Sequence, residues 1–504
     1  MVFINKIEQK YNFSFSSFKT IIIVALIFRL FSAIFSQGYG MHDDHFVVIE
    51  TASSWSDGID NSGWLSWSEQ SIGKPQGHSF TYVGLNFLLF KFIKIFGISD
   101  PKILMIFNRI FHALLSLLTV YFGMKITEKI STKKNAVLVG WILSLLWVFP
   151  FLSVRNLVEI AAIPFLIWGS WLLIKNDKRV NFFYAGLLIG LAISFRYQIG
   201  VFAVAIAAYY FFKWKWKEFL LFCLGVVVIF SATQGIVDYY VWGYPFAEFI
   251  GYAIYNMNEG TQYLPNSNYL MYFWVLMGVL LFPFGLLIAI GFFRSIKQNL
   301  LLFLPTISFI LFHTFYPNRQ ERFVLSVLPF FIILGVVGFE KLKEKSFWNK
   351  TWKTSLIIFW ILNIPLLLFL SFTYSKKSRV ESMYAIYGNK IKEEQILLEG
   401  TLETKPSMLP QFYANSWDCK FTERVDTSQT LLVNEGAEYD YIFFFGEENV
   451  RGRMLQYKKI YPKLKLVKIC NPSKLDVLLR KMNPRNKNQY IEVWETQSYK
   501  NIKR

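Results

Sequence analysis

Long apolar runs, separated by short polar segments, dominate the first three quarters of the chain. Most of them approach the roughly 20 residues that an α-helix needs to cross the hydrocarbon core of a bilayer. They lie near 20–35, 80–97, 102–126, 136–152, 157–174, 181–212, 217–237, 268–291, 299–315, 322–339 and 353–373. The pattern predicts a polytopic α-helical membrane protein with about 11 transmembrane helices, in a range of about 11 to 13.

The run at 181–212 leaves the number of spans open. It is long for a single span, and Arg196 interrupts it. Counted as one span, it gives about eleven spans and a C-terminus outside the cytoplasm; counted as two, it gives about twelve and a C-terminus inside. We favour the single span.

Composition and charge support the membrane prediction. The chain of 504 residues is 54% hydrophobic and only 17% charged, whereas soluble domains carry about 25% charged residues. Its net charge is +19, but basic clusters such as 213–217 lie between apolar runs, as they do in cytoplasmic loops. We therefore expect membrane lipids as partners and no nucleic acid. The loop 38–79, rich in acids and poor in bases, and the long loop 238–268 are predicted to lie outside the cytoplasm.

The character of the chain changes near Tyr374. No later run could span a membrane, and the pattern predicts a buried strand at 439–446, a helix at 454–461 and an alternating strand at 464–469. We therefore divide the chain into a membrane module, 1–373, and a small extramembrane α/β domain, 374–504, outside the cytoplasm. Its cysteines, Cys419 and Cys470, could pair in an oxidising compartment or remain free thiols.

Two adjacent acids, Asp43 and Asp44, directly follow the first apolar run. Desolvation and mutual repulsion raise the pKa of one carboxylate of such a pair, so that it can act as a general base on an alcohol. The alternative is an ordinary acidic start of a helix. His42 and His45 could join the acids as metal ligands, but we expect neither a metal nor another cofactor.

Polar groups also interrupt the later apolar runs. Guanidinium groups suit phosphate oxygens, which makes Arg196, Arg319 and Arg322 candidates for binding a phosphate. The alternative is that these arginines reach the membrane surface as ordinary interfacial residues. Asn156 and Glu159 lie in a similar setting.

The aromatic and asparagine-rich stretch from 244 to 272 includes Gln262 and Tyr263. Aromatic faces and side-chain amides suit sugar recognition, although interfacial anchoring explains the same aromatics. The chain has no GxxxxGK[ST], GxGxxG or DxD motif, so nothing indicates a nucleotide site.

Four segments in order, 41–50, 152–159, 195–196 and 318–323, resemble motifs of glycosyltransferase family 22, the lipid-linked mannosyltransferases that build dolichol-linked oligosaccharides and GPI anchors. Asp43, Asp44 and Glu50 fall on the acidic positions of the family's His-Pro-Asp-Glu-x-Phe-Gln-x-x-Glu motif, with Met41 in place of its His. The resemblance covers about 21–339.

The resemblance implies the membrane GT-C fold and an inverting glycosyltransferase. Such an enzyme moves a sugar, here expected to be mannose, from a polyprenyl-phosphate donor to a glycan or lipid acceptor outside the cytoplasm. Asp43 would be the base and Asp44 its neighbour, and Arg322, with Arg319 or Arg196, would bind the donor phosphate. The expected substrate-binding residues are Glu50, Asn156, Glu159, Gln262 and Tyr263.

Alternatives within this fold are transfer to protein or to lipid A with another sugar. A lipid-linked sugar transporter or flippase is the alternative outside enzymes. We expect the bacterial inner membrane, with the active site facing the periplasm, and keep the endoplasmic reticulum membrane as the alternative.

Overall fold

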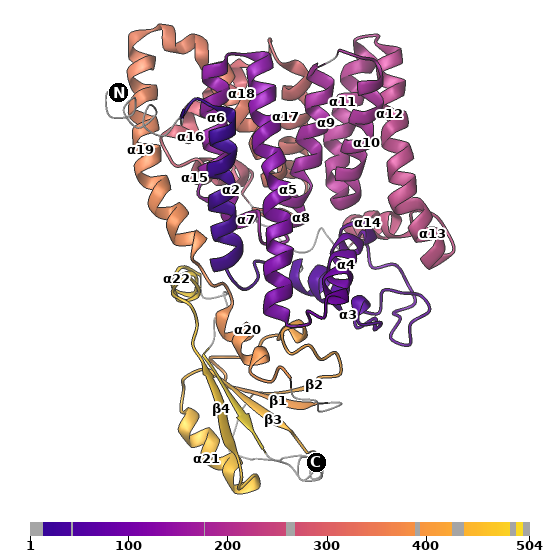
Figure 1. Cartoon of the computed structure of the whole chain (residues 1–504), viewed down its shortest axis with the longest axis vertical. Coiled ribbons are helices and arrows are strands. Elements are labelled where there is room, and N and C mark those ends of the chain that lie inside the picture. The colour runs from indigo at the N-terminus through magenta and orange to yellow at the C-terminus, as the bar shows by residue number, and fades with distance from the viewer. Residues whose placement is uncertain are drawn as a thin grey trace. The chain divides into compact units, whose positions relative to one another are not determined.

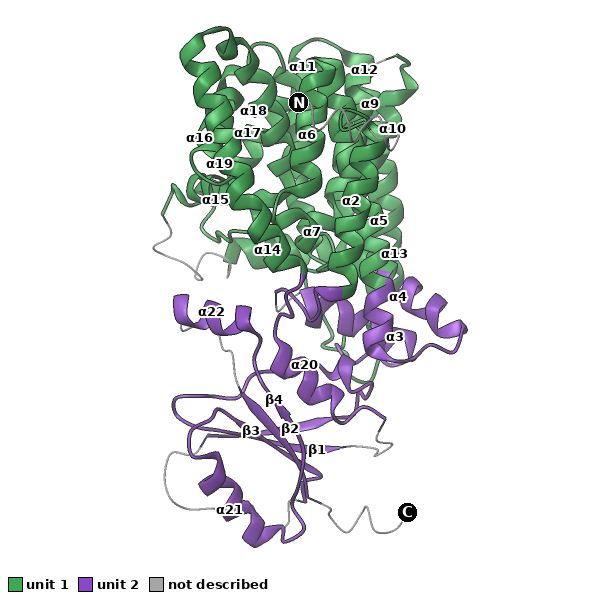
Figure 2. Ribbon diagram, turned by 60° about the vertical axis from the view of Figure 1, so that its left-hand side comes forward, with its two compact units in different colours: residues 1–34, 63–85, 108–371 green, residues 35–62, 86–107, 372–504 purple. Residues whose placement is uncertain are grey.

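The computed structural model describes residues 14–41, 44–175, 177–258, 268–388, 394–425, 438–483 and 490–496. The chain divides into two compact units, coloured separately in Figure 2. Unit 1 comprises residues 1–34, 63–85 and 108–371, and unit 2 comprises residues 35–62, 86–107 and 372–504.

Unit 1 is helical, and its longer helices run side by side (Figure 1). Its helices, three of which have part of their length in unit 2, are α2 (Phe18–Phe35), α4 (Phe80–Ile95), α5 (Pro101–Ile130), α6 (Lys133–Leu145), α7 (Val148–Leu152), α8 (Val158–Ala161), α9 (Ile163–Lys175), α10 (Val180–Phe195), α11 (Gly200–Phe212), α12 (Trp216–Phe230), α13 (Ile236–Trp242), α14 (Ala247–Asn258), α15 (Met271–Val279), α16 (Phe284–Arg294), α17 (Leu300–Phe315), α18 (Leu328–Phe339) and α19 (Ser346–Ser371).

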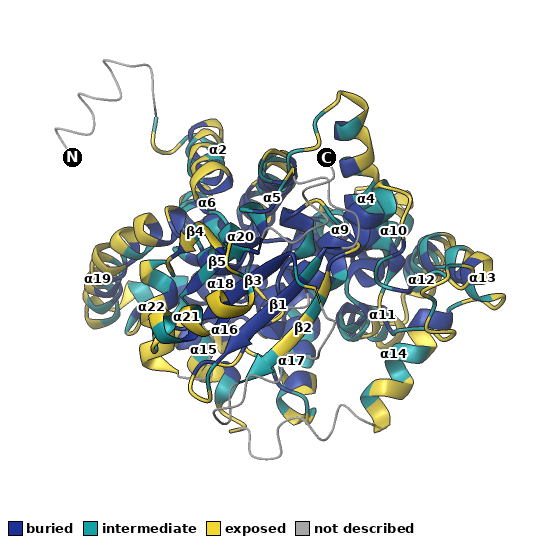
Figure 3. Cartoon of the chain, turned by 90° about the horizontal axis from the view of Figure 1, so that it is seen from below, coloured by how far each residue is buried: buried dark blue, intermediate teal, exposed yellow. Residues whose placement is uncertain are grey.

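Six helical stretches of the described residues are long and apolar enough to cross a membrane. They are Phe18–Phe35, Pro101–Ile130, Val158–Lys175, Trp216–Trp242, Phe323–Glu344 and Ser346–Ser371. The bent pair α15 and α16 would make a seventh, and α10, α11 and α17 are shorter apolar helices. In α19, apolar residues such as Ile357 and Ile361 are exposed, and exposed positions recur along this helix in Figure 3.

The run at 181–212 is two helices, which corrects its interpretation as a single span. α10 ends at Phe195, Arg196 has extended backbone angles, and α11 begins at Gly200. Phe182, at the start of α10, packs against Tyr210, at the end of α11, with ring centroids 5.4 Å apart. The chain therefore reverses direction at Arg196.

The run at 80–97 also differs from its prediction as a span. α4 has 16 residues, a length of about 24 Å, and it is not among the helices that are long and apolar enough to cross. Its second half belongs to unit 2, where Lys94 pairs with Asp57.

Glycines allow α16 and α18 to pack with their backbones in contact. A Cβ atom at Gly291 of α16 would overlap the carbonyl of Gly335 in α18, and one at Gly338 would overlap the carbonyl of Gly291. Close approach over small residues is how helices associate inside membranes, where lipid removes the usual hydrophobic driving force. This packing fixes the second half of α18, which follows Arg322 and the 3₁₀ turn Phe323–Val327, against α16.

Unit 2 contains a π-helix (Asp44–Glu50) that continues into α3 (Thr51–Ser56), and α20 (Lys377–Tyr384). A mixed sheet follows with the order β2-β1-β3-β5-β4. Its elements are β1 (Gln395–Gly400), β2 (Lys420–Val425), β3 (Tyr441–Phe445), α21 (Val450–Ile460), β4 (Lys465–Cys470), α22 (Lys474–Met482) and β5 (Ile491–Glu495). β2 and β3 pair with β1 in parallel, whereas β5 pairs with β3 and β4 antiparallel.

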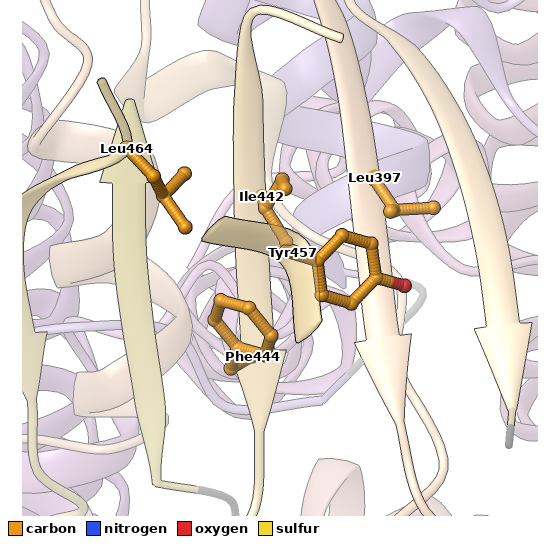
Figure 4. Close-up of a cluster of buried hydrophobic side chains, with 5 residues drawn as sticks. All are labelled: Leu397, Ile442, Phe444, Tyr457 and Leu464. Carbon is orange, nitrogen blue, oxygen red and sulfur yellow. The ribbon is translucent and has the colours of Figure 1, made fainter. Parts of the chain in front are cut away.

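The core of the sheet lies under α21. Leu397, Ile442 and Phe444 from the strands pack with Tyr457 of α21 and with Leu464 (Figure 4). β3 is buried along its whole length, whereas the edge strand β2 is largely exposed (Figure 3). The buried ion pair of Arg453 with Glu399 fixes α21 against the end of the sheet.

The C-terminal elements confirm the predicted strand, helix and strand as β3, α21 and β4. Cys419 and Cys470 are both buried free thiols. The sheet belongs to unit 2, in which residues 372–504 are joined by the earlier segments 35–62 and 86–107. The division into a membrane module, 1–373, and an extramembrane domain, 374–504, stays a prediction.

Replacing Gly291 by alanine tests the backbone packing of α16 on α18. The added methyl group meets the Gly335 carbonyl, so we expect a loss of about 1–3 kcal/mol in the free energy of unfolding. Thermal unfolding of the detergent-solubilised protein measures it. Gly278→Ala is the matched control, because a Cβ there meets no atom within 4 Å. Equal unfolding temperatures for the two variants would contradict the packing.

Candidate active site

The acidic segment after the first helix is described from Asp44 onward, and Asp43 and His42 lie outside the described residues. Asp44 is the first residue of the π-helix and is buried. π-helices are rare, and they occur often at functional sites because their wider turn is held by surrounding structure.

Aromatic rings of unit 2 enclose His45, the residue after Asp44. The imidazole stacks with the ring of Tyr39, with centroids 4.4 Å apart, and with the ring of Tyr413, at 5.6 Å. Its Nε2 atom lies 3.7 Å from Oε1 of Glu50. The same Glu50 oxygen accepts a hydrogen bond of 3.2 Å from the backbone N–H of Phe412. The π-helix is thus held at both ends.

Burial controls the charge of Glu50. It raises the pKa of this carboxyl from 4.5 to about 8, although the backbone N–H groups of Phe412 and Gln411 act in the opposite direction. Glu50 is therefore protonated and uncharged at neutral pH, and it contacts its neighbours in this neutral form. His45 and Tyr39 are titratable neighbours of this carboxyl.

In unit 1, three charged side chains meet at breaks in the apolar helices. Glu159 lies in the first turn of α8, Arg196 lies at the turn between α10 and α11, and Arg322 directly precedes the 3₁₀ turn Phe323–Val327. Oε1 of Glu159 lies 3.1 Å from Nη2 of Arg196 and 3.6 Å from Nε of Arg322. A carboxylate whose side chain is only 1% exposed requires such cationic partners.

Neighbouring polar and aromatic groups orient both guanidinium groups. Nε of Arg196 donates to Gln198 over 2.9 Å, and Nε of Arg322 donates to Gln320 over 2.8 Å. Arg196 lies over the ring of Phe323, 4.8 Å from its centroid. With two cations and one anion, this cluster has a net positive charge, which suits an anionic ligand.

Arg319 lies close to the same region. Its guanidinium lies over the ring of Tyr269, 4.2 Å from the centroid, and donates to the carbonyl of Tyr316. Arg319 and Arg196 both interact electrostatically with the buried Tyr272. His313 packs against Phe323, and its buried Nε2 has no hydrogen-bond partner among the described residues.

Asn156 belongs to a separate buried network. Its Nδ2 donates to Asn108 over 2.6 Å and to Tyr82 over 3.4 Å, and Tyr82 is bonded to His112. Its backbone is left-handed, with φ of 57°, which asparagine tolerates better than most residues. This turn separates α7 from α8, and Glu159 lies in the first turn of α8.

The structure therefore brings Glu159, Arg196 and Arg322 together, with Arg319 in the same part of unit 1. Gln262 and Tyr263 lie outside the described residues. Among the part of the chain that the structure describes, no group of three or more His, Cys, Asp or Glu side chains could hold a metal ion. The roles of all these residues, including substrate binding by Glu50 and Asn156, stay predictions.

Sequence reasoning missed the aromatic partners of the acidic segment. Tyr413 and Phe412 lie more than 350 residues after His45, and no local pattern indicates that they meet. It also missed His313 and Gln198. A histidine within the apolar run at 299–315, and a glutamine two residues after the interrupting arginine, were the available signals.

Solved structures show the class of protein to which this fold belongs. ArnT from Cupriavidus metallidurans in the apo state is 11% identical, with a TM-score of 0.59 over 94% of this chain and 97% of ArnT. ArnT bound to undecaprenyl phosphate is 12% identical, with a TM-score of 0.60 over 95% and 98%. AglB from Archaeoglobus fulgidus, in complex with an inhibitory peptide and a dolichol-phosphate, is 11% identical, with a TM-score of 0.51 over 77% and 62%. The protein thus has the GT-C fold of membrane glycosyltransferases.

The sequence identifies the family more closely. Residues 20–396 match the Alg9-like mannosyltransferase family, and the chain belongs to that family. A comparison with curated proteins gives no match. The protein is a glycosyltransferase and a multi-pass membrane protein, as the motifs and the apolar helices indicated.

The raised pKa of Glu50 predicts how stability depends on pH. Between pH 4.5 and about 8 the folded chain keeps a proton that the unfolded chain has released, so this group's contribution to the free energy of unfolding falls as the pH rises. Between pH 5 and 8, we expect the unfolding temperature of wild type in detergent to fall relative to that of Glu50→Gln, which cannot titrate. Parallel curves for the two proteins would show that Glu50 titrates normally.

Proposed function

We propose that the protein transfers mannose from a polyprenyl-phosphate donor to a glycan or lipid acceptor outside the cytoplasm. The observation that carries the proposal is the cluster of Arg196, Arg322 and Glu159 among apolar helices in a chain of the Alg9-like mannosyltransferase family. Cationic groups at this position suit a phosphate whose lipid tail remains in the membrane. Undecaprenyl phosphate and dolichol-phosphate in the ArnT and AglB structures support this donor class.

The arginines would bind the donor phosphate and stabilise it as it leaves. When the anomeric carbon–oxygen bond breaks, its electron pair remains on the phosphate, and the nearby guanidinium groups offset the developing negative charge. Glu159 would hold Arg196 and Arg322 in place before the donor binds, because a preorganised charge needs no rearrangement during the reaction. Arg319 would add a further positive charge.

The acid pair would act on the acceptor. The carboxylate of Asp43 takes the proton of the acceptor hydroxyl while that oxygen attacks the anomeric carbon, and Asp44 orients or tunes this base. One glycosidic bond forms as the bond to phosphate breaks, with inversion at the anomeric carbon. The sugar–phosphate bond is already activated, so positioning and charge stabilisation suffice.

Purified protein in detergent, incubated with radiolabelled polyprenyl-phosphate mannose and a panel of glycan, lipid and peptide acceptors, tests the proposal directly. We expect label to move to a glycan or lipid acceptor. Asp43→Asn should reduce the rate by about 10²–10⁴-fold, the usual contribution of a general base. Glu69→Gln, an exposed acid in the predicted loop 38–79, is the control and should retain activity.

Donor consumption in detergent also separates the enzyme from a transporter, since a transporter has no gradient to use there. Wild-type transfer rates in Asp43→Asn would disprove the assignment of the base. Failure of the wild-type protein to consume the mannose donor, with transfer of another lipid-linked sugar, would replace mannose and keep the reaction class.

The arginine cluster gives a second prediction. Arg322→Ala and Arg196→Ala should each lower kcat by about 10²–10³-fold, the usual cost of losing one group that stabilises developing charge. Lysine at either position keeps the charge but loses the planar geometry, so we expect partial activity. Arg294→Ala, at the exposed end of α16, is the control. Full activity of both alanine variants would exclude the cluster from the donor site.

A further inference from the structure

The connection between β1 and β2 in unit 2 also contacts the segment that contains Asp44. β1 and β2 are parallel neighbours, so the chain must cross over between their ends. Residues 401–419 form this crossover, and within it lies the 3₁₀ turn Gln411–Tyr413. We call residues 411–417 the crossover clamp.

One end of the crossover clamp contacts the π-helix that begins with Asp44. The Tyr413 ring is stacked on His45 at an interplanar angle of 9°. Phe412 meets the same imidazole edge to face, with centroids 6.0 Å apart, and its backbone N–H donates to Glu50. Phe412 and Tyr413 are each only 1% exposed, so they have little room to move.

The other end of the crossover clamp contacts the residue that follows α3. Nε1 of Trp417 donates to Oδ2 of Asp57 over 2.9 Å, and Oδ1 of Asp57 pairs with Lys94 of α4. Phe412 also packs on Phe90 of α4, with ring centroids 5.8 Å apart. The crossover clamp therefore contacts the segment from Asp44 to Asp57 both near its beginning and at its end.

We propose that the crossover clamp positions Asp44 for catalysis, with Tyr413 and Phe412 as positioning residues that act through His45 and Glu50. The inference rests on the proposed function in one respect, the catalytic role of Asp43 and Asp44. It assigns a role to a part of the chain beyond residue 396, where the family match ends.

The physical reason is that the residue held by the crossover clamp, His45, is adjacent to Asp44 in the chain. His45 directly follows Asp44 in the chain, so contacts that fix the His45 side chain also restrict movement of the backbone at Asp44. A displacement of about 1 Å in a reacting group can cost about 10²-fold in rate. Stacking of Tyr39 and Tyr413 on His45 and the hydrogen bond from Phe412 to Glu50 restrict such movement.

Kinetics of three variants test the proposal. Tyr413→Ala removes the stacked ring, and we expect kcat to fall by roughly 10- to 100-fold with the donor KM little changed. Tyr413→Phe keeps the ring and should restore most of kcat. Tyr457→Ala is the matched control, because it removes a buried tyrosine from the core of the same sheet; it should lower the unfolding temperature and leave kcat unchanged.

Hydrogen exchange of residues 44–56 gives a readout that needs no substrate. We expect faster exchange of these amides in Tyr413→Ala than in wild type or Tyr457→Ala. If Tyr413→Ala does not fold, Trp417→Phe, which loses the hydrogen bond to Asp57, should raise exchange at residues 51–56 and lower kcat to a smaller extent.

Unchanged exchange in these variants, or equal losses of kcat in Tyr413→Ala and Tyr457→Ala, would overturn the proposal. The failure of the proposed function is a separate result. In that case the wild-type protein would transfer no sugar from any lipid-linked donor, while the exchange data would still decide whether the crossover clamp holds the segment.

Discussion

The burial of one carboxylate, Glu159, among apolar helices is the constraint on which the rest of the unit 1 site depends. An isolated charge there would cost several kcal/mol, so Arg196 and Arg322 must stay within reach. Each of the three residues lies where a helix begins, breaks or reverses. The interruptions in the apolar runs therefore place these charged side chains at helix ends, where they can pair with one another among the apolar helices.

The acidic segment of unit 2 is held by different forces. Aromatic rings stack on His45, and the backbone N–H of Phe412 donates a hydrogen bond to the buried Glu50. Tyr39, which stacks on His45, is itself hydrogen-bonded to Arg379.

Much of the fold follows from local pattern. The apolar runs at 136–152 and 157–174 appear as α6 with α7 and α8 with α9, and two of the C-terminal strands, β3 and β4, lie where the sequence predicted a buried and an alternating strand. The motifs around Glu159, Arg196 and Arg322 could be found because charged residues in apolar surroundings are costly and therefore informative. The run at 181–212 was misjudged, because hydrophobicity measures how apolar a segment is and says nothing about where the chain reverses.

The sequence by itself determined that this is a membrane glycosyltransferase of an identifiable family, since apolar length and ordered motifs are properties of the linear chain. Only the tertiary structure decided that Glu159 pairs with two arginines from other helices, and that Tyr413 stacks on His45. These contacts join residues that are far apart in the chain. They depend on the path of the backbone between them, which no local pattern of residues records.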